Sequence, residues 1–311
     1  MGSSAALNVL LVAEESAGIH VLRALLSSTH RIAGVLTAPT ATGGGATVAS
    51  VAEGADIHVQ PSELVKDGAF ADWVRSQDVD VLLNVHSLFL IHSDVVTAPR
   101  IGSFNLHPGP LPEYAGLNTP SWAIYHGEEH HGVTVHWMEG AIDTGAIAYE
   151  SRFPIGANET GLSLTVRAVR EGLPLLERLL QDAAQGPDAI PVVEQDLSRR
   201  RYFGREVPHD GRLSWERSAR ELTAFVRACD YFPFTSPWGH PLAQVEALSF
   251  SVLSAAPTGD ASDAPPGTIG KVEGSAVRVA AVDEWILIRR VEVDGRAQDA
   301  AGVLAPNAAG T

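Results

Sequence analysis

Residues Leu7–Ala13 read LNVLLVA and residues Val79–Val85 read VDVLLNV, two short runs dominated by aliphatic and β-branched side chains. Runs of this kind are typical of strands that are buried on both faces of a parallel sheet. Three more runs, Arg31–Leu36, Ile57–Val59 and Gly102–Leu106, alternate with segments that carry apolar residues at three- and four-residue spacing. That spacing is typical of helices that pack one face on a sheet. The alternation predicts an α/β fold with a doubly wound, mostly parallel, Rossmann-like sheet.

The chain has 311 residues, about twice the length of a common domain, which favours two domains. A polar stretch with several prolines and arginines follows the α/β half, and further short apolar runs follow that stretch. We therefore expect an α/β domain over residues 1–186, a linker over 187–209 and a smaller β-barrel-like domain, similar to an OB fold, over 210–311. Within the last domain, we expect one strand at Leu242–Val252 and a mobile loop at Ala255–Pro266.

The overall charge limits the kinds of partner. The chain carries 22 Lys and Arg against 37 Asp and Glu, a formal net charge of −15, which disfavours non-specific binding to nucleic acid or anionic lipid. The single cysteine, Cys229, excludes an internal disulfide and suits a reducing compartment. The longest apolar run, Val79–Ile91, is interrupted by polar residues and is too short to span a bilayer. We expect a cytoplasmic protein with no membrane partner, and the sequence leaves its oligomeric state open.

Three polar residues have complementary chemistry. Asn105 and His107 are two positions apart at the end of an expected strand, so their side chains project from the same face. Asp143 follows in the tight loop Ile142–Gly145. An amide, an imidazole and a carboxylate suit acyl transfer to a nucleophile that arrives with the substrate, because none of them has to be the nucleophile. On the residues alone, a turn amide, a helix-flanking imidazole and an ordinary loop acid would explain the same pattern.

A family resemblance favours the acyl-transfer interpretation of these three residues. The stretches Asn105–His107, Pro108–Gly116 and Asp143–Gly145, at these separations, resemble the signature of the formyltransferases that use 10-formyltetrahydrofolate. Further along the chain, Tyr202–Arg205 and Asp210–Trp215 resemble the start of the C-terminal domain of that family. The resemblance implies a formyltransferase fold with 10-formyltetrahydrofolate as co-substrate and without a metal.

The resemblance also implies roles for individual residues. Asn105, His107 and Asp143 would form the catalytic set, in which Asn105 and a protonated His107 stabilise the negative charge on the formyl oxygen. Asp143 would orient His107 and relay the proton of the attacking amine. The loops after the fourth strand and before the aspartate would bind the folate, through His86, Ser87, Leu88, Phe89, Leu90, Gly140, Ala141, Ile142 and Asp143. The three apolar residues of the first loop would line the pterin slot, or they are plain core.

The resemblance also bears on the acceptor, through the loop that follows His107. This loop has Ala115 before Gly116, where many relatives have an arginine, and it is more similar to formyltransferases of natural-product pathways. We therefore expect a small or carrier-bound primary amine, such as an amino acid, an aminoacyl carrier or an amino sugar, and do not expect tRNA. The alternatives are a methionyl-tRNA formyltransferase, a 10-formyltetrahydrofolate hydrolase and a non-catalytic folate-binding module. The expected acceptor residues are Pro110, Tyr114, Gly116, Asn118, Trp122 and Tyr125.

Overall fold

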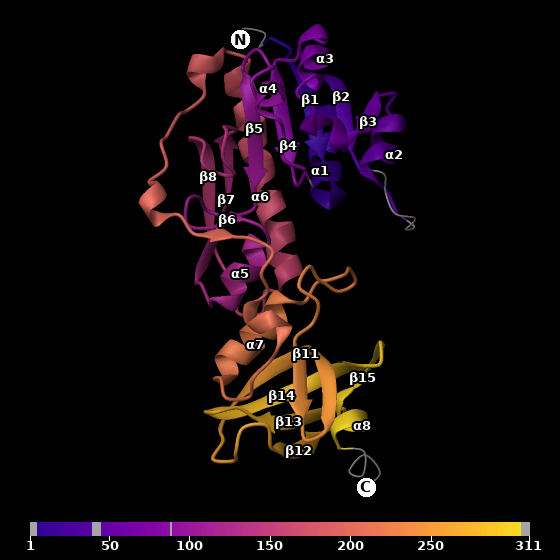
Figure 1. Ribbon diagram of the computed structural model, residues 1–311, viewed down its shortest axis with the longest axis vertical. Coiled ribbons are helices and arrows are strands. Elements are labelled where there is room, and N and C mark those ends of the chain that lie inside the picture. The colour runs from indigo at the N-terminus through magenta and orange to yellow at the C-terminus, as the bar shows by residue number, and fades with distance from the viewer. Residues whose placement is uncertain (1–4, 39–44, 88, 306–311) are drawn as a thin grey trace. The chain divides into compact units, whose positions relative to one another are not determined.

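The computed structural model describes residues 5–38, 45–87 and 89–305 (Figure 1). The chain divides into two compact units that interleave along the sequence. The first unit comprises residues 1–116, 132–153 and 166–202, and the second comprises residues 117–131, 154–165 and 203–311. Short segments of the α/β half therefore belong to the second unit.

A seven-stranded sheet forms the centre of the first unit, in the order β3-β2-β1-β4-β5-β7-β8. Strands β1 to β5 pair in parallel, and β7 runs antiparallel to β5. Each residue of β1 is buried, which explains why apolar residues dominate its sequence. This sheet confirms the doubly wound, mostly parallel fold. Its strands are β1 Asn8–Ala13, β2 Arg31–Thr37, β3 Val59–Pro61, β4 Val81–Val85, β5 Gly102–His107, β7 His130–Trp137 and β8 Ile147–Pro154.

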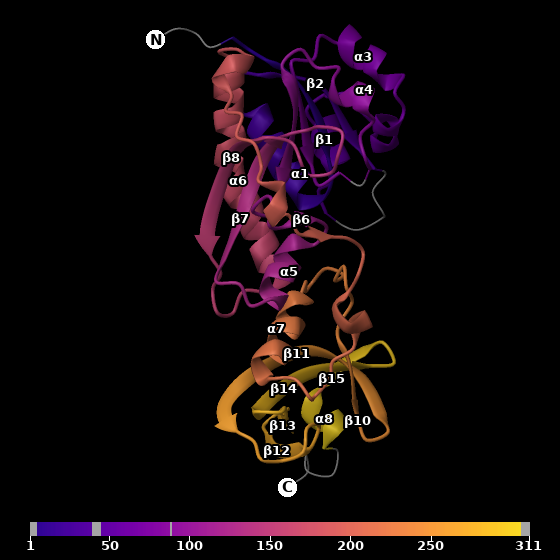
Figure 2. The ribbon, with the colours of Figure 1, turned by 60° about the vertical axis from the view of Figure 1, so that its left-hand side comes forward.

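Helices cover both faces of this sheet, because alternate side chains of a buried strand point to opposite faces. Leu10 and Leu82 pack in one apolar cluster with residues of α3 (Phe70–Ser76) and α4 (Ser93–Val96). On the opposite face, Leu83 lines a cavity together with residues of α1 and α6, two helices that lie beside the sheet in Figure 2. The helices on this side are α1 Glu15–Leu26, α2 Val48–Glu53 and α6 Gly161–Ala183.

The strand order determines which edge of the sheet can hold a ligand. Strands β1 and β4 are neighbours, although β2 and β3 lie between them in the sequence, so the winding of the chain reverses there. In open α/β sheets, ligands bind beyond the carboxyl ends of the strands near such a point. Strand β4 ends at Val85 and β5 at His107, and the polar residues singled out in the sequence lie in or just after these two strands.

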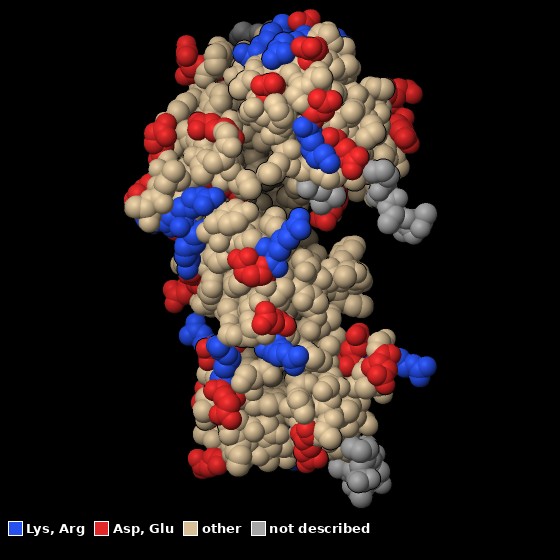
Figure 3. Space-filling model, in the orientation of Figure 1, with Lys and Arg blue, Asp and Glu red and all other residues tan. Residues whose placement is uncertain are grey.

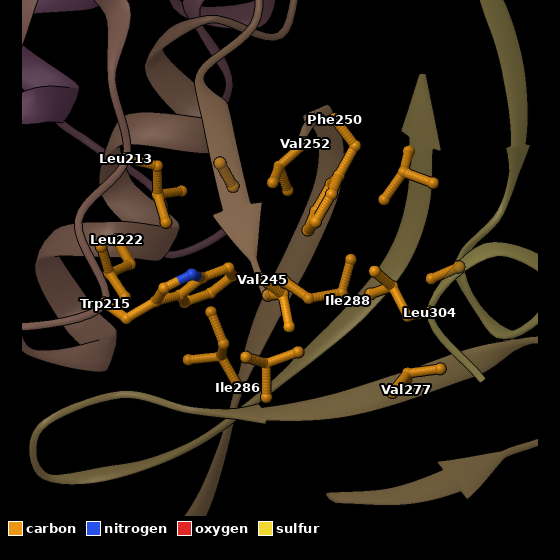
Figure 4. Close-up of a cluster of buried hydrophobic side chains, with 14 of the residues drawn as sticks. Leu213, Trp215, Leu222, Val245, Phe250, Val252, Val277, Ile286, Ile288 and Leu304 are labelled. Carbon is orange, nitrogen blue, oxygen red and sulfur yellow. The ribbon is translucent and has the colours of Figure 1, made fainter. Parts of the chain in front are cut away.

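The second unit combines helices α5 (Thr119–Tyr125) and α7 (Ala219–Ala228), which contact each other, with a six-stranded antiparallel sheet. Helix α7 begins at a capping box, in which Ser218 and Glu221 satisfy each other's backbone N–H groups. Figure 4 shows the apolar core, where Trp215 lies beside residues of both the helix and the sheet. The remaining elements are β10 Leu242–Val245, β11 Leu248–Ala261, β12 Ile269–Glu273, β13 Ala276–Ala280, β14 Glu284–Val293, β15 Arg296–Asp299 and α8 Ala300–Leu304.

Two sequence predictions for this unit are wrong. The run Leu242–Val252 is not one strand, because the chain turns at Glu246, which has a φ of +52°, and so forms β10 and β11. The segment Ala255–Pro266 is not a loop throughout, because β11 continues to Ala261. Residues 255–257 pair with residues 286–288 of β14. Backbone hydrogen bonds thus hold a segment whose small and polar side chains are typical of loops.

The polar stretch 187–209 forms local structure, and its residues up to Tyr202 belong to the first unit. It contains the 3-10 helices Pro187–Ala189 and Leu197–Arg199, and it leads into strand β9 (Tyr202–Phe203), which pairs with β6 (Ala115–Gly116). Ahead of that strand, Val193 exchanges two backbone hydrogen bonds with Ile147 of β8, at 2.8 and 3.0 Å. Polar composition indicates exposure to solvent, but it does not exclude backbone pairing.

Candidate active site

Strand β5 carries Asn105 and His107 to the carboxyl edge of the sheet. The strand lies between β4 and β7, so both residues stand in the interior of the sheet rather than on a free edge. Asn105 pairs in register with Asn84 of β4 and with His136 of β7. His107 is only 3% exposed, so water screens its interactions poorly.

Asp143 reaches the same edge from the loop between β7 and β8. Its φ is +54°, in the left-handed region that Asp tolerates better than most residues. Gly145 allows the loop to approach β7 closely, because a Cβ at this position would lie 2.0 Å from the carbonyl oxygen of Trp137. On its other side, Gln195 Nε2 donates to the carbonyl oxygens of Asp143 at 3.1 Å and Gly145 at 2.7 Å. Backbone contacts therefore fix the position of the carboxylate.

The three predicted groups meet at the carboxylate of Asp143. Its Oδ1 lies 3.4 Å from Asn105 Nδ2, and its Oδ2 lies 3.6 Å from His107 Nδ1. The Oδ2 atom also accepts a hydrogen bond of 2.8 Å from the backbone N–H of Gly116. His107 Nε2–H donates to the carbonyl oxygen of Tyr114 at 2.6 Å, which leaves Nδ1 facing the carboxylate. The structure thus brings Asn105, His107 and Asp143 together.

Burial and these contacts determine the charges of the site. Burial lowers the pKa of His107, and the Asp143 carboxylate and the Tyr114 carbonyl offset this only in part. Burial raises the pKa of Asp143, but His107, His136 and the Gly116 N–H outweigh it and hold this pKa well below its usual range. At neutral pH the resting site therefore holds an ionised Asp143 and a neutral His107. A protonated His107 that stabilises the oxyanion during transfer stays a prediction.

Three residues that the sequence analysis did not select also contact this trio. His136 Nε2 lies 3.1 Å from Asn105 Nδ2 and 3.4 Å from Asp143 Oδ1. Asn84 Nδ2 donates to Asn105 Oδ1 at 2.9 Å. Asn84 could have been found in the sequence because it is a polar residue inside an apolar strand. His136 could have been found from the alternation of side chains along its strand. Gln195 gave no signal, because it stands among other polar residues.

The first loop expected to bind folate begins directly after β4. His86 has a φ of +54°, and its buried Nε2 has no hydrogen-bond partner among the described residues. Ser87 Oγ accepts a hydrogen bond of 3.3 Å from the N–H of Phe89, which tightens the turn. Phe89 is partly buried and packs against the apolar cluster that includes residues of α3, and its part in folate binding stays a prediction. Leu88 lies outside the described residues.

The remaining residues expected at the folate site are open to solvent. Leu90 is 70% exposed and Ile142 is 40% exposed, so the core alternative fails for Leu90. Gly140 and Ala141 are exposed as well and directly precede the loop of Asp143. The exposed side chain of Ile142, next to Asp143 in the chain, is suited to contact a flat, partly apolar ligand. The part of these residues in folate binding stays a prediction.

Two of the six predicted acceptor residues contact the trio, and a third contacts one of these two. Tyr114 and Gly116 contact it through their backbone carbonyl and N–H groups. The carbonyl oxygen of Pro110 accepts a hydrogen bond of 2.9 Å from the N–H of Tyr114, which closes the turn between them. The loop after His107 therefore shapes the site with its backbone.

The other three, Asn118, Trp122 and Tyr125, belong to the second unit. Asn118 has a φ of +54° and precedes α5. The Trp122 ring stacks on Phe203 at a centroid distance of 4.9 Å, and the Tyr125 hydroxyl lies 2.7 Å from His209 Nε2. Packing within their own unit accounts for both aromatic side chains, and their contact with an acceptor stays a prediction.

An amide, an imidazole and a carboxylate meet at the carboxyl edge of a doubly wound sheet, the edge at which open α/β sheets bind ligands. Residues 2–178 match the formyl transferase family, and residues 207–305 match the formyl transferase C-terminal domain. The chain belongs to the formyl transferase family and is an enzyme of formyl transfer.

Relatives and solved structures agree with this assignment. Methionyl-tRNA formyltransferase from Synechococcus sp. (strain JA-3-3Ab) is 32% identical over 246 residues, which cover 78% of this chain and 74% of the relative. The same enzyme from Lachnospira eligens is 26% identical over 301 residues and 93% of each chain. The N-formyltransferase from Helicobacter canadensis, solved with folinic acid and dTDP-3-aminofucose, covers 92% of this chain and 100% of its own, with a TM-score of 0.71 and 16% identity. HypX from Aquifex aeolicus, solved with tetrahydrofolic acid, covers 97% of this chain and 47% of its own, with a TM-score of 0.67 and 16% identity. At such identities the structural matches establish the fold alone.

Neither a metal-binding cluster nor a membrane-spanning helix is found among the described residues. Within 5–38, 45–87 and 89–305, no group of three or more His, Cys, Asp or Glu is arranged to hold a metal ion. In that part of the chain, no helix is long and apolar enough to cross a membrane. The 23-residue helix α6 illustrates this, because charged residues such as Arg167, Glu171 and Arg178 interrupt its apolar positions.

Proposed function

We propose that the enzyme takes the formyl group of 10-formyltetrahydrofolate and passes it to the primary amine of methionyl-tRNA. The observation that supports this chemistry is that Asn105 and His107 both lie beside the carboxylate of Asp143. The folate compounds bound to the structurally similar N-formyltransferase and to HypX support the choice of donor. Two exposed apolar side chains, Leu90 and Ile142, would contact the pterin.

The reaction has a simple balance. The neutral amine attacks the formyl carbon and forms a new C–N bond, which moves charge onto the formyl oxygen. The bond between that carbon and N10 of the folate then breaks, and the proton of the amine ends on N10. The chain has to stabilise the oxyanion, take up the proton and exclude water.

The contacts of the three residues match these tasks. The NH2 group of Asn105 donates to the formyl oxygen. To do so it gives up its contact with Asp143, which at 3.4 Å is longer and weaker than its 3.1 Å contact with His136. Neutral His107 accepts the proton of the amine at Nδ1, because its Nε2–H already donates to Tyr114. The imidazolium that forms then faces the ionised Asp143, 3.6 Å away, which stabilises it.

The sequence relatives support methionyl-tRNA as the acceptor. Both relatives described above are methionyl-tRNA formyltransferases, and one is similar over 93% of this chain. The formal charge of −15 requires that the tRNA meet a local basic surface rather than the whole molecule. Figure 3 shows basic side chains in small separate groups among acidic ones on the face in view. The run Arg199–Arg201 adjoins the site, where Arg200 donates to the carbonyl oxygen of Ile142 at 3.0 Å.

A small or carrier-bound amine, in natural-product biosynthesis, is the second candidate. The acidic charge of the chain favours it, because an acceptor without a polyanionic body does not depend on Lys and Arg contacts. The similarity to an N-formyltransferase solved with an amino sugar nucleotide, over 92% of this chain, supports it as well. For such an acceptor, Tyr114 and Gly116 would line the approach of the amine.

One assay separates these candidates. Purified protein is incubated with 10-formyltetrahydrofolate and either methionyl-tRNA or a panel of amino acids, aminoacyl carriers and amino sugars, while tetrahydrofolate release and product mass are followed. We expect formyl-methionyl-tRNA over many turnovers, at a rate that falls as salt is raised.

The other outcomes contradict the proposal in distinct ways. Formylation of a small or carrier-bound amine without any reaction of methionyl-tRNA would establish the second candidate. Formate release without an added amine would indicate a hydrolase, since water would then be the nucleophile. Folate binding without turnover would indicate a non-catalytic folate-binding module.

A further inference from the structure

Asn84 stands beside the proposed oxyanion donor on the neighbouring strand. It pairs in register with Asn105 across β4 and β5, and its Nδ2 donates to Asn105 Oδ1 at 2.9 Å. Its own Oδ1 is buried and has no hydrogen-bond partner among the described residues. A buried amide oxygen without a hydrogen-bond partner destabilises the fold. An aliphatic residue at this position in the sheet would leave no polar atom unpaired.

The Asn105 amide can rotate by 180° with little change of shape, so its hydrogen-bond partners decide which atom faces the reaction. In the present orientation, Nδ2 faces His136 Nε2 and Asp143 Oδ1, at 3.1 and 3.4 Å. In the neutral form of His136, Nδ1–H donates to the carbonyl oxygen of Trp137 at 2.7 Å and Nε2 is an acceptor. Two acceptors thus attract the NH2 group, while Asn84 holds the oxygen on the opposite side.

The reverse orientation would place like against like. Asn105 Oδ1 would then face the ionised Asp143 and the lone pair of His136, and its NH2 would face the NH2 of Asn84. Only the present orientation directs a donor toward the position where charge develops on the formyl oxygen. An acceptor there would repel that charge and raise the barrier to transfer.

We infer that Asn84 is a positioning residue, which holds the Asn105 amide with its NH2 group toward the reacting carbonyl. This inference rests on the proposed role of Asn105 in formyl transfer. Among the described residues, Asn84 has no hydrogen bond to His107 or Asp143, so it acts on the site through Asn105.

Asn84→Asp provides the sharpest test, because it replaces the donor by an acceptor of the same shape. An ionised carboxylate at position 84 would repel Asn105 Oδ1 and favour the reversed amide. A protonated carboxyl group could donate a hydrogen bond to Asn105 Oδ1 as Asn84 does. Burial and the nearby carboxylate raise the pKa of such a group, so its protonation falls within reach of an assay.

Titratable groups near position 84 also affect the pH dependence of kcat, so kcat of the variant is compared with that of the wild type as a ratio at each pH. They lie across Asn105, along β5, after β4 and at the end of β1, where Val12 pairs with Asn84. Because these groups are present in both proteins, a ratio removes most of their own titration. They are Asp143, His136, His107, His86 and Glu14.

We expect kcat of Asn84→Asp to be about 10- to 100-fold below the wild type at pH 8, with KM for 10-formyltetrahydrofolate within about twofold. The ratio of kcat to that of the wild type should rise as the pH falls toward 5.5. Asn84→Leu removes the donor without adding an acceptor, so its smaller loss of kcat should keep a constant ratio over pH. Asn158→Asp makes the same chemical change at an exposed position and should match the wild type.

The side-chain NH2 signals of Asn105 in 15N NMR spectra, assigned through Asn105→Ala, give a second readout. They should shift in Asn84→Asp at pH 8 and return toward their wild-type positions at low pH. Wild-type kcat of Asn84→Asp at every pH, or a loss that does not vary with pH, would overturn the inference. If Asn105→Ala itself keeps wild-type kcat, the proposed function of Asn105 fails instead, so the two failures are distinguishable.

Discussion

Asp143→Asn is expected to lower kcat by about 1,000-fold while leaving 10-formyltetrahydrofolate binding within a few fold of the wild type. Asn tolerates the φ of +54° at this position and can still accept the hydrogen bond of the Gly116 N–H. The loop should therefore keep its shape. What the variant loses is the negative charge that faces His107 Nδ1, and with it the stabilisation of the imidazolium that forms as the amine loses its proton.

Single-turnover rates with saturating donor measure this effect separately from binding. Asp188→Asn is a suitable control, because it removes the same charge from an exposed residue of the 3-10 helix Pro187–Ala189. The control should keep the wild-type rate. A single-turnover rate of Asp143→Asn within about threefold of the wild type would show that the charge of Asp143 has no part in the transfer.

Gly145→Ala is expected to lower kcat by about 100-fold and to reduce the melting temperature. The added Cβ would lie 2.0 Å from the carbonyl oxygen and 2.9 Å from the carbonyl carbon of Trp137, and both atoms belong to the backbone of β7. A strand in the interior of a sheet has little freedom to move. The loop has to shift instead and carries Asp143 with it, and a displacement of about 1 Å in an active site can cost about 100-fold in rate.

Gly302→Ala in α8 is the matched control, because no atom of the described residues, apart from the chain neighbours and the backbone of α8 itself, lies within 4 Å of the Cβ that it would add. Its kcat should equal that of the wild type, and its melting temperature should not fall, since Ala is favoured over Gly in a helix. Gly145→Ala with wild-type kcat and melting temperature would mean that the loop of Asp143 accommodates a side chain. Close packing of this loop on β7 would then not be what fixes the carboxylate.

The central sheet of the first unit could be predicted because the sequence patterns that indicate its strands are local. Runs such as Leu7–Ala13 are buried on both faces, so nearly every position is apolar, and helical spacing between the runs specifies the covering layers. The meeting of Asn105 with His107 followed from strand alternation alone. The link to Asp143 did not, because no local rule brings residues 38 positions apart into contact; the family resemblance supplied it.

Other features depend on contacts that composition does not encode. Strand β11 extends through Ala255 to Ala261 because β14 lies beside it, although the segment itself is rich in small and polar residues. Gln195 holds the loop of Asp143 from a stretch whose composition indicated only exposure. The lowered pKa of His107 follows from its burial, which outweighs the opposing effects of Asp143 and the Tyr114 carbonyl, and none of these contacts is visible in the sequence.

A double-mutant cycle on single-turnover transfer, with Asn105→Ala, Asp143→Ala and the combined variant, tests most directly whether these groups act on one reacting centre. Residues that serve one transition state give strongly non-additive effects. The contacts around the Asp143 carboxylate predict that the double variant is about as slow as the slower single variant. Losses that multiply in full, as for independent sites, would contradict a shared centre.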